Sequence, residues 1–176
     1  MKDHLKTTGT LFANHVYGIL LGFLVMFIAV IPSRMISHEY STQGLIQLIA
    51  QEIATFAGLF LFFRRLGDQW NRKDEKLLPK EIVIGNGVTA LLWCIIVLIS
   101  RFQFAPLCYQ VIHIMDVIHG AEDVQEIPME MLGREYFGQC ALIQLIHAVF
   151  FFIPMNLGYY FGAKKRSDER AKPHHT

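Results

Sequence analysis

The sequence has few cysteines and almost no net charge, and both shortages limit what the protein can be. Its 176 residues carry a formal net charge of +1, so no excess of positive charge indicates nucleic-acid binding. The three cysteines fit no zinc-binding spacing, although Cys108 and Cys140 could form one disulfide if they met. The chain also lacks the GxSxG and HExxH motifs of hydrolases and metalloproteases. We therefore expect no cofactor.

Charge is missing locally as well as overall. Four long apolar segments contain no Lys or Arg, and they comprise residues 11–31, 44–63, 82–100 and 136–161. Only the second of these segments contains an acidic residue. A helix needs about 20 mostly apolar residues to cross a bilayer, and in lipid the backbone must satisfy its own hydrogen bonds. The pattern predicts an all-α integral membrane protein, with residues 1–176 forming a single membrane domain that is a four-transmembrane-helix bundle. Its first span is expected to end at Pro32 and Ser33.

The distribution of basic residues predicts the orientation of these spans. Thirteen Lys and Arg residues lie in the N-terminal segment, in the segment between the second and third spans, and in the tail 162–176. The other two connecting segments together hold only Arg34, Arg101 and Arg134. Basic residues stay on the cytoplasmic side, so both termini are predicted to face the cytoplasm, in a multi-pass protein of the cell membrane.

The predicted outer loop, residues 101–135, is acidic, with six Asp and Glu against two Arg. Within it, the stretch PLCYQVIHIMDVIHG places Val111 and Ile118 on one side of a helix, and His113 and Asp116 on another. The run is too short to span a bilayer. It predicts an amphipathic helix at the outer interface, between the third and fourth spans.

The same stretch contains a candidate metal site at His113, Asp116 and His119. Imidazole and carboxylate groups are ordinary zinc or manganese ligands. Because the three residues are spaced three apart, their side chains spread over about 120° around an α-helix. All three could bind one ion only if the helix bends or tightens toward a 3₁₀-helix. Two other interpretations stay open, a solvated face of an interfacial helix and a sensor of external pH.

Glu52 lies inside the second apolar segment, about 12 Å from its outer end. An ionised carboxylate near the middle of a bilayer costs about 2.5–3.5 kcal/mol on insertion scales, so it should find a partner or stay protonated. In the fourth segment, His147 reaches a similar depth. If the two helices meet, Glu52 and His147, with Gln51 and Gln144 beside them, would form a pocket for a substrate or a proton.

A second polar layer is expected near the cytoplasmic ends of the spans. Asn14, His15, Asn86 and Asn156 fall at that level, and Asn side chains commonly hydrogen-bond between membrane helices. Gly18 and Gly22 have the GxxxG spacing that permits close helix packing or dimerisation.

Three functions are consistent with these features. The first is a transporter or transporter subunit with a polar intramembrane pocket at Glu52. The second is a non-catalytic assembly or regulatory membrane protein, in which Glu52 only holds helices together. The third is a metal-dependent membrane enzyme or sensor that uses His113, Asp116 and His119. Four helices leave little room for a transport route, so we expect a homo-oligomer or a larger complex in the lipid bilayer.

Overall fold

The computed structural model describes residues 2–38, 40–70, 76–100 and 137–171. The predicted interfacial helix lies outside the described residues, and so does the predicted metal site at His113, Asp116 and His119. In the described part of the chain the secondary structure is helical and contains no strand, which confirms the predicted all-α class for these residues.

Four long helices follow one another along the chain: α1 (Lys2–Ile36), α2 (Tyr40–Trp70), α3 (Lys80–Ser100) and α6 (Phe137–Ala171). Each is long and apolar enough to cross a membrane. Many large apolar side chains on them stay exposed, among them Phe27, Ile31, Met35 and Ile99. Exposed apolar surface of this extent suits lipid better than water, so the four helices suggest a multi-pass membrane protein.

The helices are longer than the predicted spans. The predicted end of the first helix at Pro32 and Ser33 is wrong. α1 continues to Ile36, with Pro32 inside the helix. Pro32 is exposed, whereas Ser33 is buried and accepts a hydrogen bond from Gln47 Nε2 on α2 at 3.0 Å. This contact, together with the backbone bond from Ser37 N to Ser33 O at 3.1 Å, keeps the last turn helical despite the missing proline donor.

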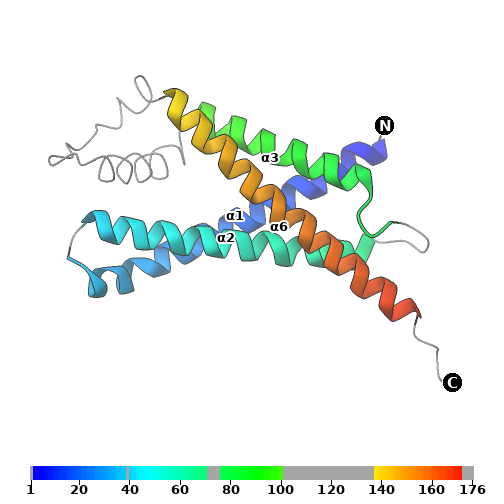
Figure 1. The fold of residues 1–176 in the computed structure, drawn as a ribbon, viewed down its shortest axis with the longest axis horizontal. Helices are drawn as coiled ribbons and strands as arrows, with labels where there is room; N and C mark the ends of the chain where they lie inside the picture. The colour runs from blue at the N-terminus through cyan, green and yellow to red at the C-terminus, as the bar shows by residue number, and fades with distance from the viewer. Residues whose placement is uncertain (1, 39, 71–75, 101–136, 172–176) are drawn as a thin grey trace.

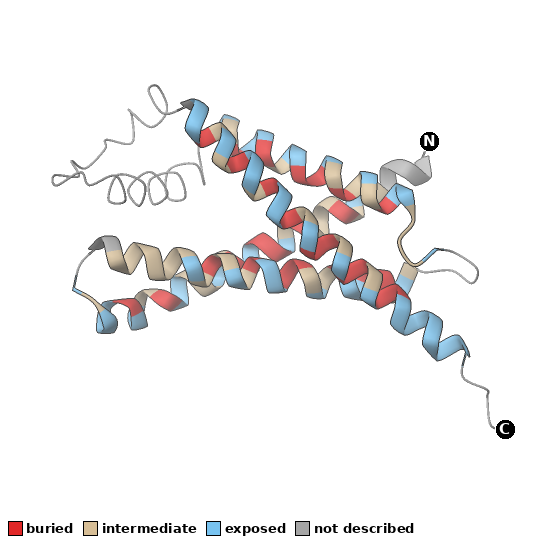
Figure 2. Cartoon of the chain, in the orientation of Figure 1, coloured by how far each residue is buried: buried red, intermediate tan, exposed pale blue. Residues whose placement is uncertain are grey.

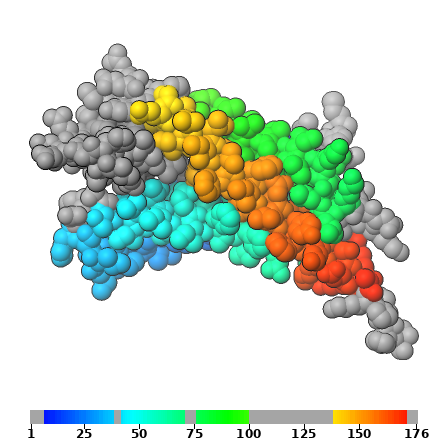
Figure 3. Space-filling view, viewed as in Figure 1, coloured from blue at the N-terminus to red at the C-terminus, as the bar shows by residue number. Residues whose placement is uncertain are grey.

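Two helix pairs cross one another in the bundle (Figure 1). α1 and α2 form an antiparallel hairpin, α3 and α6 run side by side, and α6 passes across α2. The start of α1, the end of α2, the start of α3 and the end of α6 all lie at one end of the bundle, here called the basic end. The two pairs diverge toward the opposite end. Figure 3 shows α6 lying over α2 on one face, with α3 beside it.

Glycine lets α1 approach α2 closely. A Cβ atom on Gly18 would lie 2.6 Å from the side chain of Leu59, and one on Gly22 would lie 2.9 Å from the carbonyl oxygen of Gln51. Gly58 on α2 lies opposite Gly18. The GxxxG pair of α1 is therefore used for packing within the chain, which is one of the two roles that its spacing allowed.

A second GxxxG pair fixes the crossing of α6 over α2, near the basic end. A Cβ atom on Gly158 would meet the carbonyl oxygen of Phe60, and one on Gly162 would meet that of Arg64. Gly67 on α2 similarly faces the backbone of α6. Figure 2 shows buried positions recurring along α6 up to this crossing and exposed positions beyond it. We call this contact the glycine crossing.

Candidate functional site

The predicted meeting of Glu52 and His147 is present in the structure. Glu52 Oε2 lies 2.6 Å from His147 Nε2, and the two side chains come from α2 and α6. Glu52 is ten residues along from Thr42, where the apolar part of α2 begins, and His147 is nine residues along from Gly138 on α6. At 1.5 Å per residue both lie roughly 15 Å inside their helices, at matching depths.

The face of α2 that carries Glu52 follows from helix geometry. The backbone oxygen of Gln51 and the side chain of Thr55, four residues further on, both lie against Gly22 on α1. Glu52 follows Gln51 by one residue, which turns its side chain by about 100° away from α1 and toward α6. The close packing of α1 on α2 therefore determines that the carboxylate faces His147.

This contact can exist in two proton arrangements. With the carboxyl group ionised, the Nε2–H of His147 donates to Glu52 Oε2, and with it neutral, the carboxyl O–H donates to Nε2. The side chains of His147 and Glu52 are 15% and 30% exposed, so the pair is partly buried but not sealed.

The two glutamines lie near the pair without joining it. Gln51 and Gln144 are both buried, and neither makes a hydrogen bond to Glu52 or His147 within the described ranges. The side-chain nitrogen of Gln144 is buried without a hydrogen-bond partner in the described structure. The structure thus brings together two of the four residues proposed from the sequence, and the others stay candidates for positioning a ligand.

A row of rings leads from this pair into the bundle. The His147 ring is 4.1 Å from the Phe151 ring, measured between centroids. Phe151 in turn meets His15 of α1 edge-on at 5.6 Å, and His15 lies 5.8 Å from Trp93 of α3. Phe151 therefore contacts both histidines.

The expected second polar layer is present in part. Asn86 Nδ2 on α3 donates to Asn156 Oδ1 on α6 at 3.1 Å, and Asn156 Nδ2 donates to the carbonyl of Phe152 at 2.8 Å. The first of these bonds joins the two helices, as expected, and the second lies within α6. Asn14 instead donates to the carbonyl of Thr10 on its own helix, at 2.8 Å.

His15 is completely buried, and one of its nitrogens has a partner. Its Nδ1 lies 3.2 Å from Met155 Sδ on α6. A thioether sulfur only accepts hydrogen bonds, so Nδ1 carries the proton and the neutral ring keeps Nε2 as an acceptor. His15 Nε2 has no hydrogen-bond partner in the described structure. Three buried polar atoms on α3 also lack a hydrogen-bond partner there: Asn86 Oδ1, Thr89 Oγ1 and Trp93 Nε1.

Thr89 and Trp93 were not identified from the sequence. They follow Asn86 by three and seven residues, so all three lie along one face of α3. The signal was the 3–4-residue spacing of polar groups on an otherwise apolar helix. A buried polar group without a partner costs about 1–3 kcal/mol, so four together require a compensating role.

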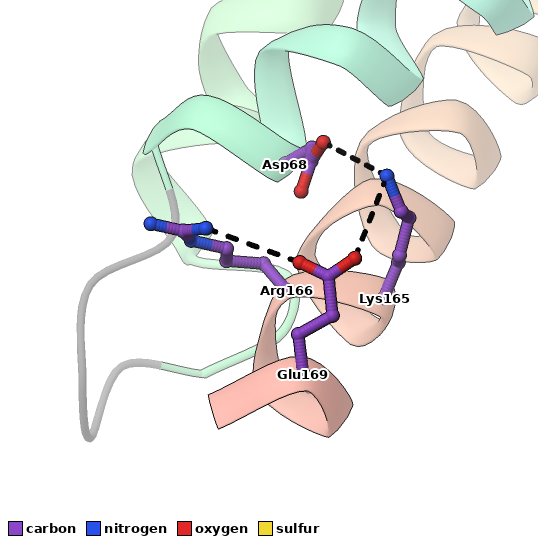
Figure 4. A network of polar contacts seen from close by, with 4 residues as sticks. All are labelled: Asp68, Lys165, Arg166 and Glu169. Atoms are coloured by element: carbon purple, nitrogen blue, oxygen red, sulfur yellow. Dashed lines mark hydrogen bonds and ion pairs between the residues drawn. The ribbon is translucent and has the colours of Figure 1, made fainter. Parts of the chain in front are cut away.

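Charged contacts lie at the basic end, away from this interior (Figure 4). Lys165 Nζ on α6 lies 3.3 Å from Asp68 Oδ2 on α2 and 3.7 Å from Glu169 Oε1. Arg166 approaches the other oxygen of Glu169 at 3.9 Å. All four side chains are substantially exposed, so each pair contributes only about 0–1 kcal/mol.

Comparisons with known proteins add no relative. No protein-family model matches the chain, and no curated protein or solved structure matches it. The candidate site is therefore defined by its own geometry: a carboxyl group and an imidazole in contact across two apolar helices.

Proposed function

We propose that this protein is a membrane carrier, or the membrane subunit of one, in which the Glu52–His147 pair takes up and releases a proton. One observation carries the proposal. The only acidic residue inside the four predicted spans meets an imidazole from another helix at hydrogen-bond distance. Titratable groups within membrane spans commonly belong to ion or proton pathways.

The charge pattern supports a definite orientation for this carrier. Arg64, Arg65, Lys80, Lys164 and Lys165 all belong to helix segments at the basic end of the bundle. Under the positive-inside rule this end faces the cytoplasm, and the Glu52–His147 pair lies in the outer half of the cell membrane. A proton from the outside would then reach the pair before it meets the glycine crossing.

The energetics of the pair suit reversible proton exchange. Moving the shared proton onto Glu52 leaves two neutral groups, and moving it onto His147 leaves two opposite charges in contact. Apolar surroundings disfavour separated charges, so the pair resists the loss of either partner. A polar cargo or a change in helix spacing at this level would shift the balance between the two arrangements.

A non-catalytic assembly or regulatory role is the second candidate, and the same contact supports it. A hydrogen bond between α2 and α6 stabilises the bundle whether or not its proton is exchanged, by about 0.6 kcal/mol on average for bonds between membrane helices. Exposed apolar side chains on α1, such as Leu24 and Phe27, would then contact partner helices in a homo-oligomer or larger complex.

The substitution Glu52→Gln separates the two candidates. Glutamine has nearly the same shape and can still hydrogen-bond to His147, but it cannot bind and release a proton. We expect purified wild-type protein in liposomes to dissipate an imposed pH gradient, followed with a trapped pH-sensitive dye, and Glu52→Gln to abolish this flux. The matched control is Glu81→Gln, which removes an exposed acid at the start of α3 and should leave the flux unchanged.

Folding must be followed alongside the flux. Helix content and the elution volume in detergent should be the same for both variants as for wild type. Proton flux in Glu52→Gln equal to that of wild type would reject the proton role and leave Glu52 as a structural contact.

A further inference from the structure

A group of unpartnered polar atoms lies between α1, α3 and α6, inside the bundle. His15 comes from α1, and Asn86, Thr89 and Trp93 share one face of α3. Three of these residues are fully buried: His15, Asn86 and Thr89 each expose none of their surface. The 5.8 Å contact between the His15 and Trp93 rings places these two side chains together, and Thr89 and Asn86 continue along the same face of α3 toward the basic end. We call this set the inner polar cluster.

The hydrogen-bonding roles of the cluster are complementary to those of water. His15 Nε2 and Asn86 Oδ1 are acceptors, because Nδ1 of His15 carries its proton toward Met155 and an amide oxygen cannot donate. Trp93 Nε1–H is a donor, and the Thr89 hydroxyl can act in either sense. The four atoms extend over about 10 Å of α3, so satisfying them takes more than one small molecule that both donates and accepts hydrogen bonds. Water does so in buried polar sites.

A charged ligand fits this cluster poorly. Apart from Glu52, the predicted spans contain no Asp, Glu, Lys or Arg that could balance a charge there. The other titratable groups in the described spans of the surrounding helices are neutral or distant from the cluster in sequence: Tyr17 on α1, Cys94 on α3, and Cys140, His147, Tyr159 and Tyr160 on α6. His147 is reached only through the Phe151 ring, with Glu52 of α2 bonded to it. The cluster therefore favours small neutral molecules.

We infer that the inner polar cluster binds water and forms the inner step of a proton path whose outer step is the Glu52–His147 pair. The path is suggested by Phe151, whose ring contacts the rings of both His147 and His15. An excess proton carried by the bound water passes to His15 Nε2, which leaves a neutral water molecule and an imidazolium, and the same proton then leaves Nε2 for water while Nδ1 keeps its own. The path rests on the proposed function, whereas water binding does not.

Phe151 then acts as the barrier between the two steps. Its ring carries no exchangeable proton, so a proton passes only when the ring moves aside or when water reaches around it. An inward step from His15 leads toward the Asn86–Asn156 hydrogen bond, which joins α3 to α6 on the side of the basic end. The inner polar cluster thus continues the route beyond the candidate site.

Water binding can be measured directly by solid-state NMR of the whole protein in lipid bilayers. Histidine is labelled with ¹⁵N, the His15 signal is assigned by its loss in His15→Phe, and transfer of magnetisation from water protons is recorded. We expect contact between water and His15 Nε2, and a several-fold weaker contact in Thr89→Val. Thr55→Val is the matched control, because Thr55 is an equally buried threonine on α2, outside the cluster.

The path is tested by proton flux in liposomes, using the same variants. We expect flux to fall several-fold in His15→Phe and in Thr89→Val, and to stay at the wild-type level in Glu81→Gln, which changes an exposed residue at the start of α3. Absence of any water contact at His15 in the wild type would overturn the inference. Wild-type flux in His15→Phe, with flux abolished by Glu52→Gln, would overturn the inner step alone and leave the proposed function standing.

A third outcome would reject the proposed function but keep water binding at the inner polar cluster. If water contacts His15 but neither His15→Phe nor Glu52→Gln changes the flux, the proposed function fails and the inner polar cluster remains a structural water site. Thr89→Val keeps the volume of the side chain, so it serves as the second variant if His15→Phe does not fold.

Discussion

The glycine crossing and the Glu52–His147 region are both contacts between α2 and α6, yet they are built in opposite ways. At the crossing, backbone meets backbone, because Gly158 and Gly162 remove the side chains that would separate the helices. At the pair, the helices are joined by two long polar side chains that reach toward each other. The first contact tolerates almost no change in helix spacing, and the second can accommodate some.

This difference suggests a division of labour along the two helices. The crossing lies near the end of α2 and in the second half of α6, close to the basic end, whereas Glu52 and His147 lie in the first halves of the same helices. Figure 1 shows that the two helix pairs diverge toward the end away from the basic end. Small rotations about the crossing as a fixed point displace distant atoms more than near ones. A change in the protonation of Glu52 or His147 can therefore be accompanied by a change in helix spacing without disrupting the crossing.

The largest effect is expected from filling the glycine crossing. In Gly162→Ala the added methyl group would meet the backbone oxygen of Arg64, which cannot move without shifting α2. We expect a loss of about 1–3 kcal/mol of stability, measured by thermal or denaturant unfolding in detergent. Gly138→Ala is the control, since nothing lies within 4 Å of a Cβ there. Equal stability of the two variants would show that the crossing is not tight.

A smaller effect is expected from the hydrogen bond between α3 and α6. Asn86→Leu keeps the approximate size of the side chain but leaves Asn156 Oδ1 without its donor at 3.1 Å. The expected loss is about 0.5–2 kcal/mol in the same unfolding assay. Asn14→Leu is the comparison, because Asn14 bonds only to the carbonyl of Thr10 on its own helix. A larger loss from Asn14→Leu would contradict the assigned roles of the two residues.

The smallest effect is expected at the surface of the basic end. Asp68→Asn removes the ion pair between Asp68 and Lys165. The Asp68 side chain is 31% exposed and the Lys165 side chain is 50% exposed. We expect a change of about 0–1 kcal/mol at low salt that disappears at high salt, because solvent ions screen exposed pairs. The comparison is Asp168→Asn, which replaces an exposed acidic residue on α6. A large, salt-independent loss in Asp68→Asn would mean that this contact belongs to the fixed point.

Sequence reasoning was most successful where one strong physical constraint acts. The cost of a charge in lipid made Glu52 conspicuous, and helix rise placed His147 at the same depth, so their meeting could be predicted from two positions. The four helices followed from the absence of Lys and Arg over long segments. In both cases a local pattern was sufficient.

Prediction from the sequence was less successful for contacts that depend on which neighbouring helix packs against a residue. Gly158 and Gly162 have the same spacing as Gly18 and Gly22, but only the path of α6 over α2 shows what they contact. Gln51 is next to Glu52 and buried, yet it makes no hydrogen bond to the pair in the described structure. Such features depend on helix crossing angles, which no single helix pattern specifies.

The most direct test of the central claim is infrared difference spectroscopy of the protein in lipid bilayers, recorded as the pH is changed. If Glu52 and His147 share an exchangeable proton, a carboxyl band should appear and disappear with pH, vanish in Glu52→Gln and shift in His147→Gln. A spectrum in which Glu52→Gln removes no pH-dependent band would contradict the claim, because Glu52 would then keep one protonation state throughout.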